Sequence, residues 1–296
     1  MILRVPVADD FFKCAPLTPD QVEHFRQYGY ESAHDLVEYT QLTDGRIEWV
    51  LHTKLTASSG RSTQIYKAKE DGLPMYCAQT EVEATLDDMI AIFLTTNTQD
   101  AREANAAIFP DVPDIFRLYN ITLPTPEKPH FCQPSTGVSY RHPCGHQEEC
   151  LINGKRAWIR VLKHVEVDAC PSLEENYNII RGYHLHAGHM YIESDRPGFL
   201  KVIELMHCRA GGSLSGALGE FMAAKTLEIR YSAMNATQKQ VNAFKLRKLV
   251  FLPVQALVPK SSRSKCAVCL KKFGALTSRS RCRRCGEVVC RKACSS

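Results

Sequence analysis

Six of the chain's 13 cysteines lie in its last 31 residues, with the spacing of metal ligands. The pattern is C-x2-C, twelve residues, C-x2-C, four residues, and C-x3-C, formed by Cys266, Cys269, Cys282, Cys285, Cys290 and Cys294. Two thiolates separated by two residues can point at one tetrahedral Zn²⁺, and a second pair closes the site. The sequence therefore predicts a small module at residues 262–296 that holds Zn²⁺ as its cofactor.

Charge is distributed unevenly along the chain. Residues 260–296 contain 11 Lys or Arg and one acid, Glu287, which gives this tail a charge of +10. Since the whole chain carries +5, residues 1–259 carry −5. A basic tail on an acidic body indicates an anionic partner, such as a membrane surface or a nucleic acid. Nucleic acid is disfavoured, because the tail has no helix with base-reading residues at zinc-finger spacing.

Residues Cys282–Gly286 read C-R-R-C-G, and Val288–Cys290 lead into the third cysteine pair. This segment resembles the core of the FYVE zinc finger, a family that binds phosphatidylinositol 3-phosphate on endosomes. Two histidines of the family motif are Ser280 and Arg281 here, and the chain has three cysteine pairs where the family has four. The residues that could still attract the headgroup phosphates are Arg279, Arg281, Arg283 and Arg284.

Two ligand arrangements are open for the finger. The FYVE resemblance implies interleaving, in which Cys266, Cys269, Cys290 and Cys294 form one complete site. The alternative is a single site built from the two C-x2-C pairs, with the last pair left over.

The larger part of the chain, residues 1–250, reads as an α+β domain. Thr18, Pro19 and Gln21 form a capping box that begins a helix over 18–39. The other expected elements are strands at 47–55, 63–69, 75–82, 157–167, 179–192 and 199–208, helices after Thr85 and over 99–109, and a long helix over 211–235.

This order resembles a START-type domain, as do Glu81–Asp88, Ile180–Gly182 and Asp195–Gly198. The resemblance implies a helix-grip fold, in which a curved antiparallel sheet surrounds the long C-terminal helix. It also implies an apolar cavity for a lipid or sterol. The candidate cavity residues on the long helix are Leu218, Phe221, Met222 and Ile229.

Two further groups contain ligand-type residues. His184-x-His186 places two imidazoles on one face of a strand, with His189 nearby, which is a possible metal arrangement. A second group, whose spacing matches no standard site, comprises Cys132, His142, Cys144, His146 and Cys150. Because the chain has no Walker loop, dinucleotide fingerprint or H-E-x-x-H motif, we expect no enzyme.

The N-terminus lacks the apolar run of a secretory signal, and no stretch approaches a membrane span. We therefore expect a cytoplasmic protein, peripheral on endosomal membranes. The predicted function is non-enzymatic lipid binding with a zinc finger directed to anionic membranes. The alternative is a protein–protein adaptor with a filled START-like domain and a remnant finger.

Overall fold

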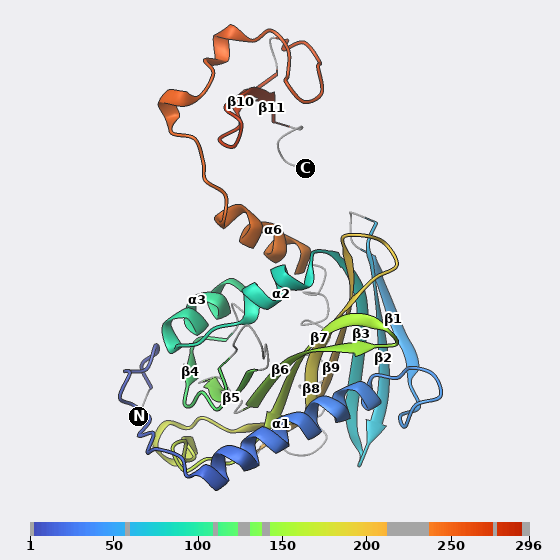
Figure 1. Ribbon diagram of the computed structural model, residues 1–296, viewed down its shortest axis with the longest axis vertical. Coiled ribbons are helices and arrows are strands. Elements are labelled where there is room, and N and C mark those ends of the chain that lie inside the picture. Colours follow the sequence, from blue (N-terminus) through green and yellow to red (C-terminus); the bar gives the residue numbers. More distant parts are fainter. Residues whose placement is uncertain are drawn as a thin grey trace. The chain divides into compact units, whose positions relative to one another are not determined.

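The computed structural model separates into two units, residues 1–241 and 242–296, both drawn in Figure 1. The ranges that it describes are 3–56, 60–108, 112–123, 131–137, 143–211, 237–274 and 277–291. Most of the predicted helix at 211–235 lies outside these residues, and so do all four candidate cavity residues on it and Cys294.

The first unit is built on a nine-stranded antiparallel sheet with the strand order β1-β2-β3-β9-β8-β7-β6-β5-β4 (Figure 1). The strands are β1 (Val50–Thr56), β2 (Ser62–Glu70), β3 (Leu73–Glu83), β4 (Ile115–Arg117), β5 (Phe131–Gly137), β6 (Pro143–Ile152), β7 (Lys155–His164), β8 (Gly182–Glu193) and β9 (Phe199–Ala210). Strand β9 joins the β1–β3 meander to the rest of the sheet. A chain connection of more than 100 residues therefore separates two hydrogen-bonded strands, β3 and β9.

Helix α1 (Pro19–Tyr39) crosses one face of this sheet over β5 to β8. Its capping box is present, with the hydroxyl of Thr18 accepting from the backbone of Gln21 and the Gln21 side chain accepting from the backbone of Thr18. The helix buries Leu36 and Tyr39 against strand residues such as Met190. This packing forms the main hydrophobic core of the described residues.

The opposite face of the sheet meets α2 (Leu86–Phe93), while α3 (Thr98–Ile108) packs on β4. Thr85 begins α2 with a second capping box, closed by Asp88. A four-residue helix, α4 (Glu174–Tyr177), lies in the connection from β7 to β8. Helix α6 (Thr237–Arg247) follows the undescribed segment.

The predicted α1, the three-strand meander, α2, α3 and the strands β7 to β9 are confirmed. The turn Asp195–Gly198 between β8 and β9 is also confirmed, with Gly198 at a φ of 77°. Strands β4 to β6 and helix α6 were not predicted individually. Prolines interrupt the sequence between 110 and 134, so the alternating pattern of an edge strand is weak there.

The second unit contains a short hairpin of β10 (Arg279–Arg281) and β11 (Val288–Cys290) and two single turns of 3₁₀ helix, Val254–Ala256 and Lys260–Ser262. The backbone N–H of Leu252 donates to the carbonyl of Arg283 at 2.7 Å, and that of Val258 donates to Gly286 at 2.9 Å. Residues ahead of the predicted limit at 262 therefore belong to the same compact unit as the finger. The segment around Leu252 hydrogen-bonds with the finger.

Candidate functional site

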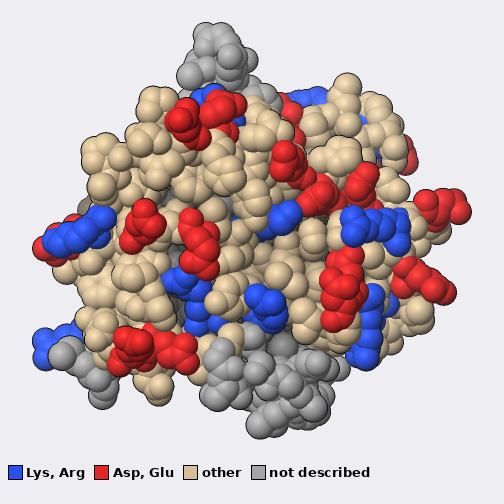
Figure 2. All heavy atoms as spheres, turned by 90° about the horizontal axis from the view of Figure 1, so that it is seen from below, with Lys and Arg blue, Asp and Glu red and all other residues tan. Residues whose placement is uncertain are grey.

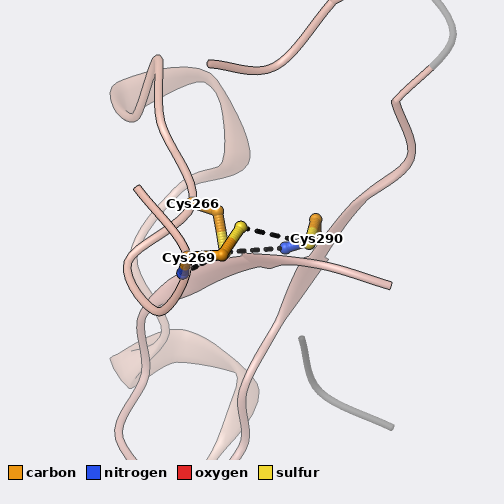
Figure 3. Close-up of side chains that lie close together, drawn as sticks. All are labelled: Cys266, Cys269 and Cys290. Carbon is orange, nitrogen blue, oxygen red and sulfur yellow. Dashed lines mark hydrogen bonds between the residues drawn. The ribbon is translucent and has the colours of Figure 1, made fainter. Parts of the chain in front are cut away.

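Three of the predicted zinc ligands converge in the second unit. The sulfur atoms of Cys266, Cys269 and Cys290 lie within 4.8 Å of one another (Figure 3). A tight turn presents the first pair, because the N–H of Leu270 donates to the carbonyl of Cys266. Strand β11 delivers Cys290 at its last position.

The spacing of these sulfur atoms suits zinc. With a Zn–S bond of about 2.3 Å, two ligands of a tetrahedral site are roughly 3.8 Å apart. The sulfur atoms of Cys269 and Cys290 are 3.7 Å apart. Cys269 and Cys290 therefore have the separation of two ligands of a bound zinc ion.

Backbone donors favour the thiolate form of Cys266. Its sulfur accepts hydrogen bonds from the N–H groups of Cys269 at 3.5 Å and of Cys290 at 3.3 Å. These two N–H groups lower the pKa of Cys266 to about 6. A metal ligand must be a thiolate, so Cys266 is prepared for coordination at neutral pH.

The grouping joins the first and third cysteine pairs, as in the interleaved arrangement. Cys282 and Cys285 are not in the group formed by the described residues. They flank a turn in which the N–H of Cys282 donates to Glu287 and that of Gly286 donates to Cys282. A single site made from the two C-x2-C pairs does not match this geometry.

The four candidate headgroup arginines lie on the β10–β11 hairpin. The guanidinium of Arg279 lies 5.2 Å from the ring centre of Phe273 and donates to the carbonyl of Lys260. Arg281 is half-buried on β10, whereas Arg283 and Arg284 are exposed in the turn that follows. The exposed pair is therefore better placed to meet an anionic surface.

The second face of the sheet, opposite α1, presents a largely apolar wall. Trp158 and Tyr191 stack with ring centres 5.4 Å apart, and Phe93 of α2 lies 6.0 Å from each. Strand β9 adds Val202 and Met206 to this face, as its register with β8 requires. The wall has the composition of a surface that contacts an apolar ligand or an apolar core.

One acid interrupts this wall. The carboxylate of Glu204 lies 3.6 Å from Nε2 of His189, and both side chains are buried. Sequence analysis did not single out Glu204. The available signal was an acid in the middle of the apolar run of β9, at the position of an inward-facing residue.

The histidines of β8 do not share one face. The register between β8 and β9 shifts between His184 and His186. His184 pairs with Cys208, with 3.3 Å between Nδ1 and Sγ, whereas His186 stacks on Tyr39 of α1. The possible metal arrangement of His184, His186 and His189 is therefore not formed, because a β-bulge separates residues that strict alternation would place together.

A hollow of about 620 Å³ lies at one end of the sheet. Its lining is polar and includes Arg61, Glu81, Arg196 and Lys201. It is not the apolar cavity that was predicted, whose four candidate residues lie outside the described part of the chain.

No protein-family model and no curated protein sequence matches this chain. Among solved structures it is similar to human StAR-related lipid transfer protein 5, with a TM-score of 0.52 and 13% identity over 75% of this chain and 99% of that one. Human STARD10 gives a TM-score of 0.42 and 11% identity over 80% of this chain and 83% of that one.

The first similarity shows that this chain has a START-type fold. The START part of the fold prediction is therefore confirmed. The FYVE-type finger stays a prediction that rests on its sequence motif. None of the helices within the described ranges has the length and apolar character to cross a bilayer.

Proposed function

We propose that the first unit binds an apolar lipid or sterol and has no enzymatic activity. The observation that carries this proposal is the fold shared with a human lipid transfer protein across 99% of that protein's chain. The ligand would lie against the wall formed by Trp158, Tyr191 and Phe93. The predicted helix at 211–235 would close the cavity from the other side, with Leu218, Phe221, Met222 and Ile229 facing the ligand.

Zinc is proposed to fold the second unit. Cys266, Cys269 and Cys290 would supply three thiolates, and Cys294 would supply the fourth under the interleaved arrangement. So short a segment buries too little apolar surface to fold by itself, so metal binding would supply its folding free energy. The chemistry of zinc here is structural rather than catalytic.

The basic tail is proposed to direct the protein to anionic membranes, with phosphatidylinositol 3-phosphate on endosomes as the specific candidate. All charged side chains of this tail are basic except Glu287, which gives the net charge of +10. The guanidinium of Arg263 donates to both carboxylate oxygens of Glu287, each at 3.0 Å. Acidic and basic side chains are instead interspersed on the face shown in Figure 2. Such a mixed face attracts an anionic surface less than a tail of one charge does.

Native mass spectrometry of the purified full-length protein tests both proposals together. We expect the Cys266→Ser/Cys269→Ser variant to contain one equivalent of zinc fewer than the unchanged protein, and a co-purified apolar molecule to stay bound in both. A protein that never carries or takes up an apolar molecule, even when offered mixed lipids and sterols, would exclude the lipid-binding proposal.

The depth of burial on the second face favours one other candidate. Trp158 and Tyr191 are each only 1% exposed, as expected for a domain filled by its own side chains. In that case the protein would be an adaptor, and the finger would dock a protein partner. Lipid uptake in the experiment above distinguishes the two candidates.

A further inference from the structure

Away from the finger, two imidazoles and a carboxylate converge beneath the C-terminal end of α1. Glu70 ends β2, His186 lies on β8 and His207 lies on β9, and one potential ligand atom from each falls within 4.8 Å of the others. His186 and His207 are register partners, with parallel rings whose centres are 5.8 Å apart. The sheet itself therefore holds the two imidazoles side by side.

His207 is the buried member of this group, and its ring nitrogens make no hydrogen bond within the described structure. Its side chain is 2% exposed. The nearest carboxylate oxygen, Oε2 of Glu70, is 3.6 Å from its Nδ1. Because buried polar groups are almost always satisfied, an imidazole in this state points to a missing ligand.

The carboxylate of Glu70 is held in place from the other side. The hydroxyl of Tyr39 donates to both of its oxygens, at 2.8 and 3.0 Å, and Arg46 donates to Oε1 at 3.2 Å. The phenol ring of Tyr39 is stacked in turn on His186, with ring centres 4.0 Å apart. These contacts orient Glu70 toward His207.

A second carboxylate lies beside His186. Oδ2 of Asp35 on α1 is 3.8 Å from Nδ1 of His186. Metal-bound histidines commonly direct their other nitrogen at such a carboxylate, which sets the ring orientation and its basicity.

We propose that Glu70, His186 and His207 bind one divalent transition-metal ion of the zinc class. Two imidazoles and a carboxylate are ligands that zinc accepts, and a fourth position stays open for water. Tetrahedral ligands about 2.0–2.1 Å from zinc are roughly 3.4 Å apart. The 3.6 Å between His207 and Glu70 is close to this value, so small side-chain rotations complete the site. The ion would tie β2, β8 and β9 together under α1.

The test uses the full-length chain with Cys266, Cys269, Cys282, Cys285, Cys290 and Cys294 changed to Ser, which removes every cysteine of the finger. After metal is stripped, Zn²⁺ is titrated calorimetrically. We expect one equivalent to bind and to raise the melting temperature of the first unit. His186→Gln and Glu70→Gln, both at partly exposed positions, should each weaken binding at least about tenfold, the lower limit seen for outer-shell partners alone.

His34→Ala is the matched control, because the exposed His34 and Glu38 form, with the half-buried Asp35, a second group on α1 that could take up zinc weakly. Zinc affinity should be unchanged in this variant. Circular dichroism of each metal-free variant checks that the fold is intact. The proposal is overturned if the six-serine protein binds no zinc, or if His186→Gln and Glu70→Gln bind it as well as their parent does.

Discussion

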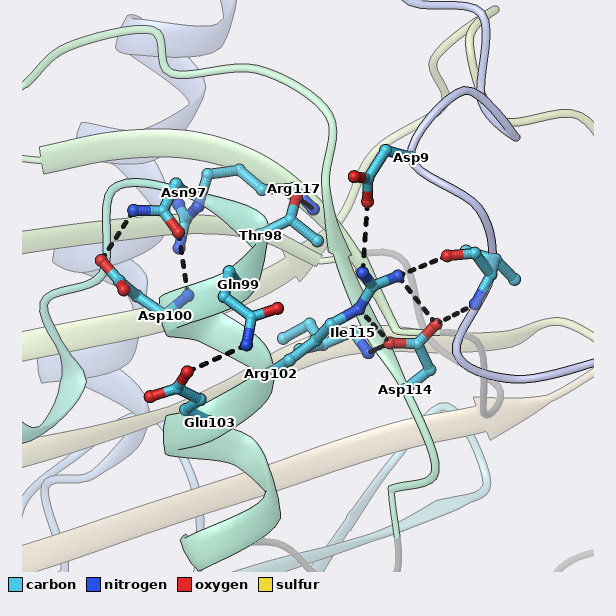
Figure 4. Close-up of polar contacts among 11 residues, drawn as sticks. Asp9, Asn97, Thr98, Gln99, Asp100, Arg102, Glu103, Asp114, Ile115 and Arg117 are labelled. Atoms are coloured by element: carbon cyan, nitrogen blue, oxygen red, sulfur yellow. Dashed lines mark hydrogen bonds and ion pairs between the residues drawn. The ribbon is translucent and has the colours of Figure 1, made fainter.

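The buried carboxylate of Asp114 accepts two hydrogen bonds from the guanidinium of Arg102, at 2.8 Å from Nε and 3.3 Å from Nη2 (Figure 4). The same two side chains hold the N-terminal segment. Arg102 donates to the carbonyl of Val7 at 2.7 Å, and Asp114 accepts from the N–H of Val7 at 2.7 Å. One ion pair thus joins α3, the start of β4 and a segment that lies about 100 residues earlier in the chain.

Replacing Asp114 with Asn should strongly destabilise the first unit. The Asp114 side chain is 1% exposed, and removal of one member of a buried ion pair costs about 3–5 kcal/mol. Urea unfolding followed by tryptophan fluorescence measures this loss. Asp10→Asn, which removes an exposed pair with Lys13, should change stability by less than about 1 kcal/mol. Equal effects of the two variants would contradict the structural role of the pair.

Gly188 sets how closely α1 approaches the sheet. A Cβ atom there would lie 2.5 Å from the carbonyl oxygen of Arg160 and 2.8 Å from Cδ2 of Leu36. Gly188→Ala should therefore lower the free energy of unfolding by about 1–3 kcal/mol, the range for overpacked cores. Chemical denaturation measures the change, and Leu151→Ala, at an exposed position, is the control. An alanine that is tolerated without loss would mean that α1 does not pack as described.

The thiol of Cys77 should report global unfolding. Burial raises its pKa to about 12, and the residue is fully buried in the core under α1. We expect alkylation by iodoacetamide at pH 8 to occur only when the first unit unfolds, whereas exposed Cys14 reacts in the native state. Because the unfolded thiol ionises near 9 and the native one near 12, Cys77 should also lower stability as the pH rises through that window. Peptide mass spectrometry of partly labelled protein measures the alkylation rates of Cys77 and Cys14. Rapid labelling of Cys77 in the native protein would contradict its burial.

Cys266→Ser should release one equivalent of zinc and unfold the second unit without affecting the first. Cys266 is the buried thiol of its group, and its sulfur accepts from two backbone N–H groups. Limited proteolysis should then remove the tail and leave residues 1–241 resistant. Cys14→Ser serves as the control for loss of an exposed cysteine. Retention of the full zinc content would show that the ligands are assigned wrongly.

Arg283→Gln/Arg284→Gln should weaken binding to vesicles that contain anionic lipid. Each basic residue near such a surface contributes about 1 kcal/mol, so the double variant should lose roughly 30-fold in affinity. Flotation with vesicles that contain phosphatidylinositol 3-phosphate measures this change, and neutral vesicles and high salt give the background. Arg156→Gln, an exposed position in the first unit, is the matched control. Equal loss in the control would assign membrane contact to the first unit.

The amino-acid sequence by itself determined the local features of this protein. The capping boxes at Thr18 and Thr85, the turn at Gly198 and the alternating strands of the meander follow from interactions a few residues apart. The cysteine spacing likewise predicted a metal module, and the first two ligands, Cys266 and Cys269, lie on one turn. Local spacing was sufficient because backbone geometry alone sets these short distances.

Only the tertiary structure decided which distant residues meet. The bulge between His184 and His186 turns His186 toward His207 and Glu70, and one shifted register changes every partner beyond it. Cys290 meets Cys266 because the N–H of Ala267 donates to the carbonyl of Val288 and the N–H of Cys290 donates to the sulfur of Cys266, contacts that short-range spacing does not specify. The ion pair of Arg102 with Asp114 depends in the same way on how the N-terminal segment, α3 and β4 pack. Such contacts arise from strand register and helix docking, which are properties of the whole fold rather than of any segment.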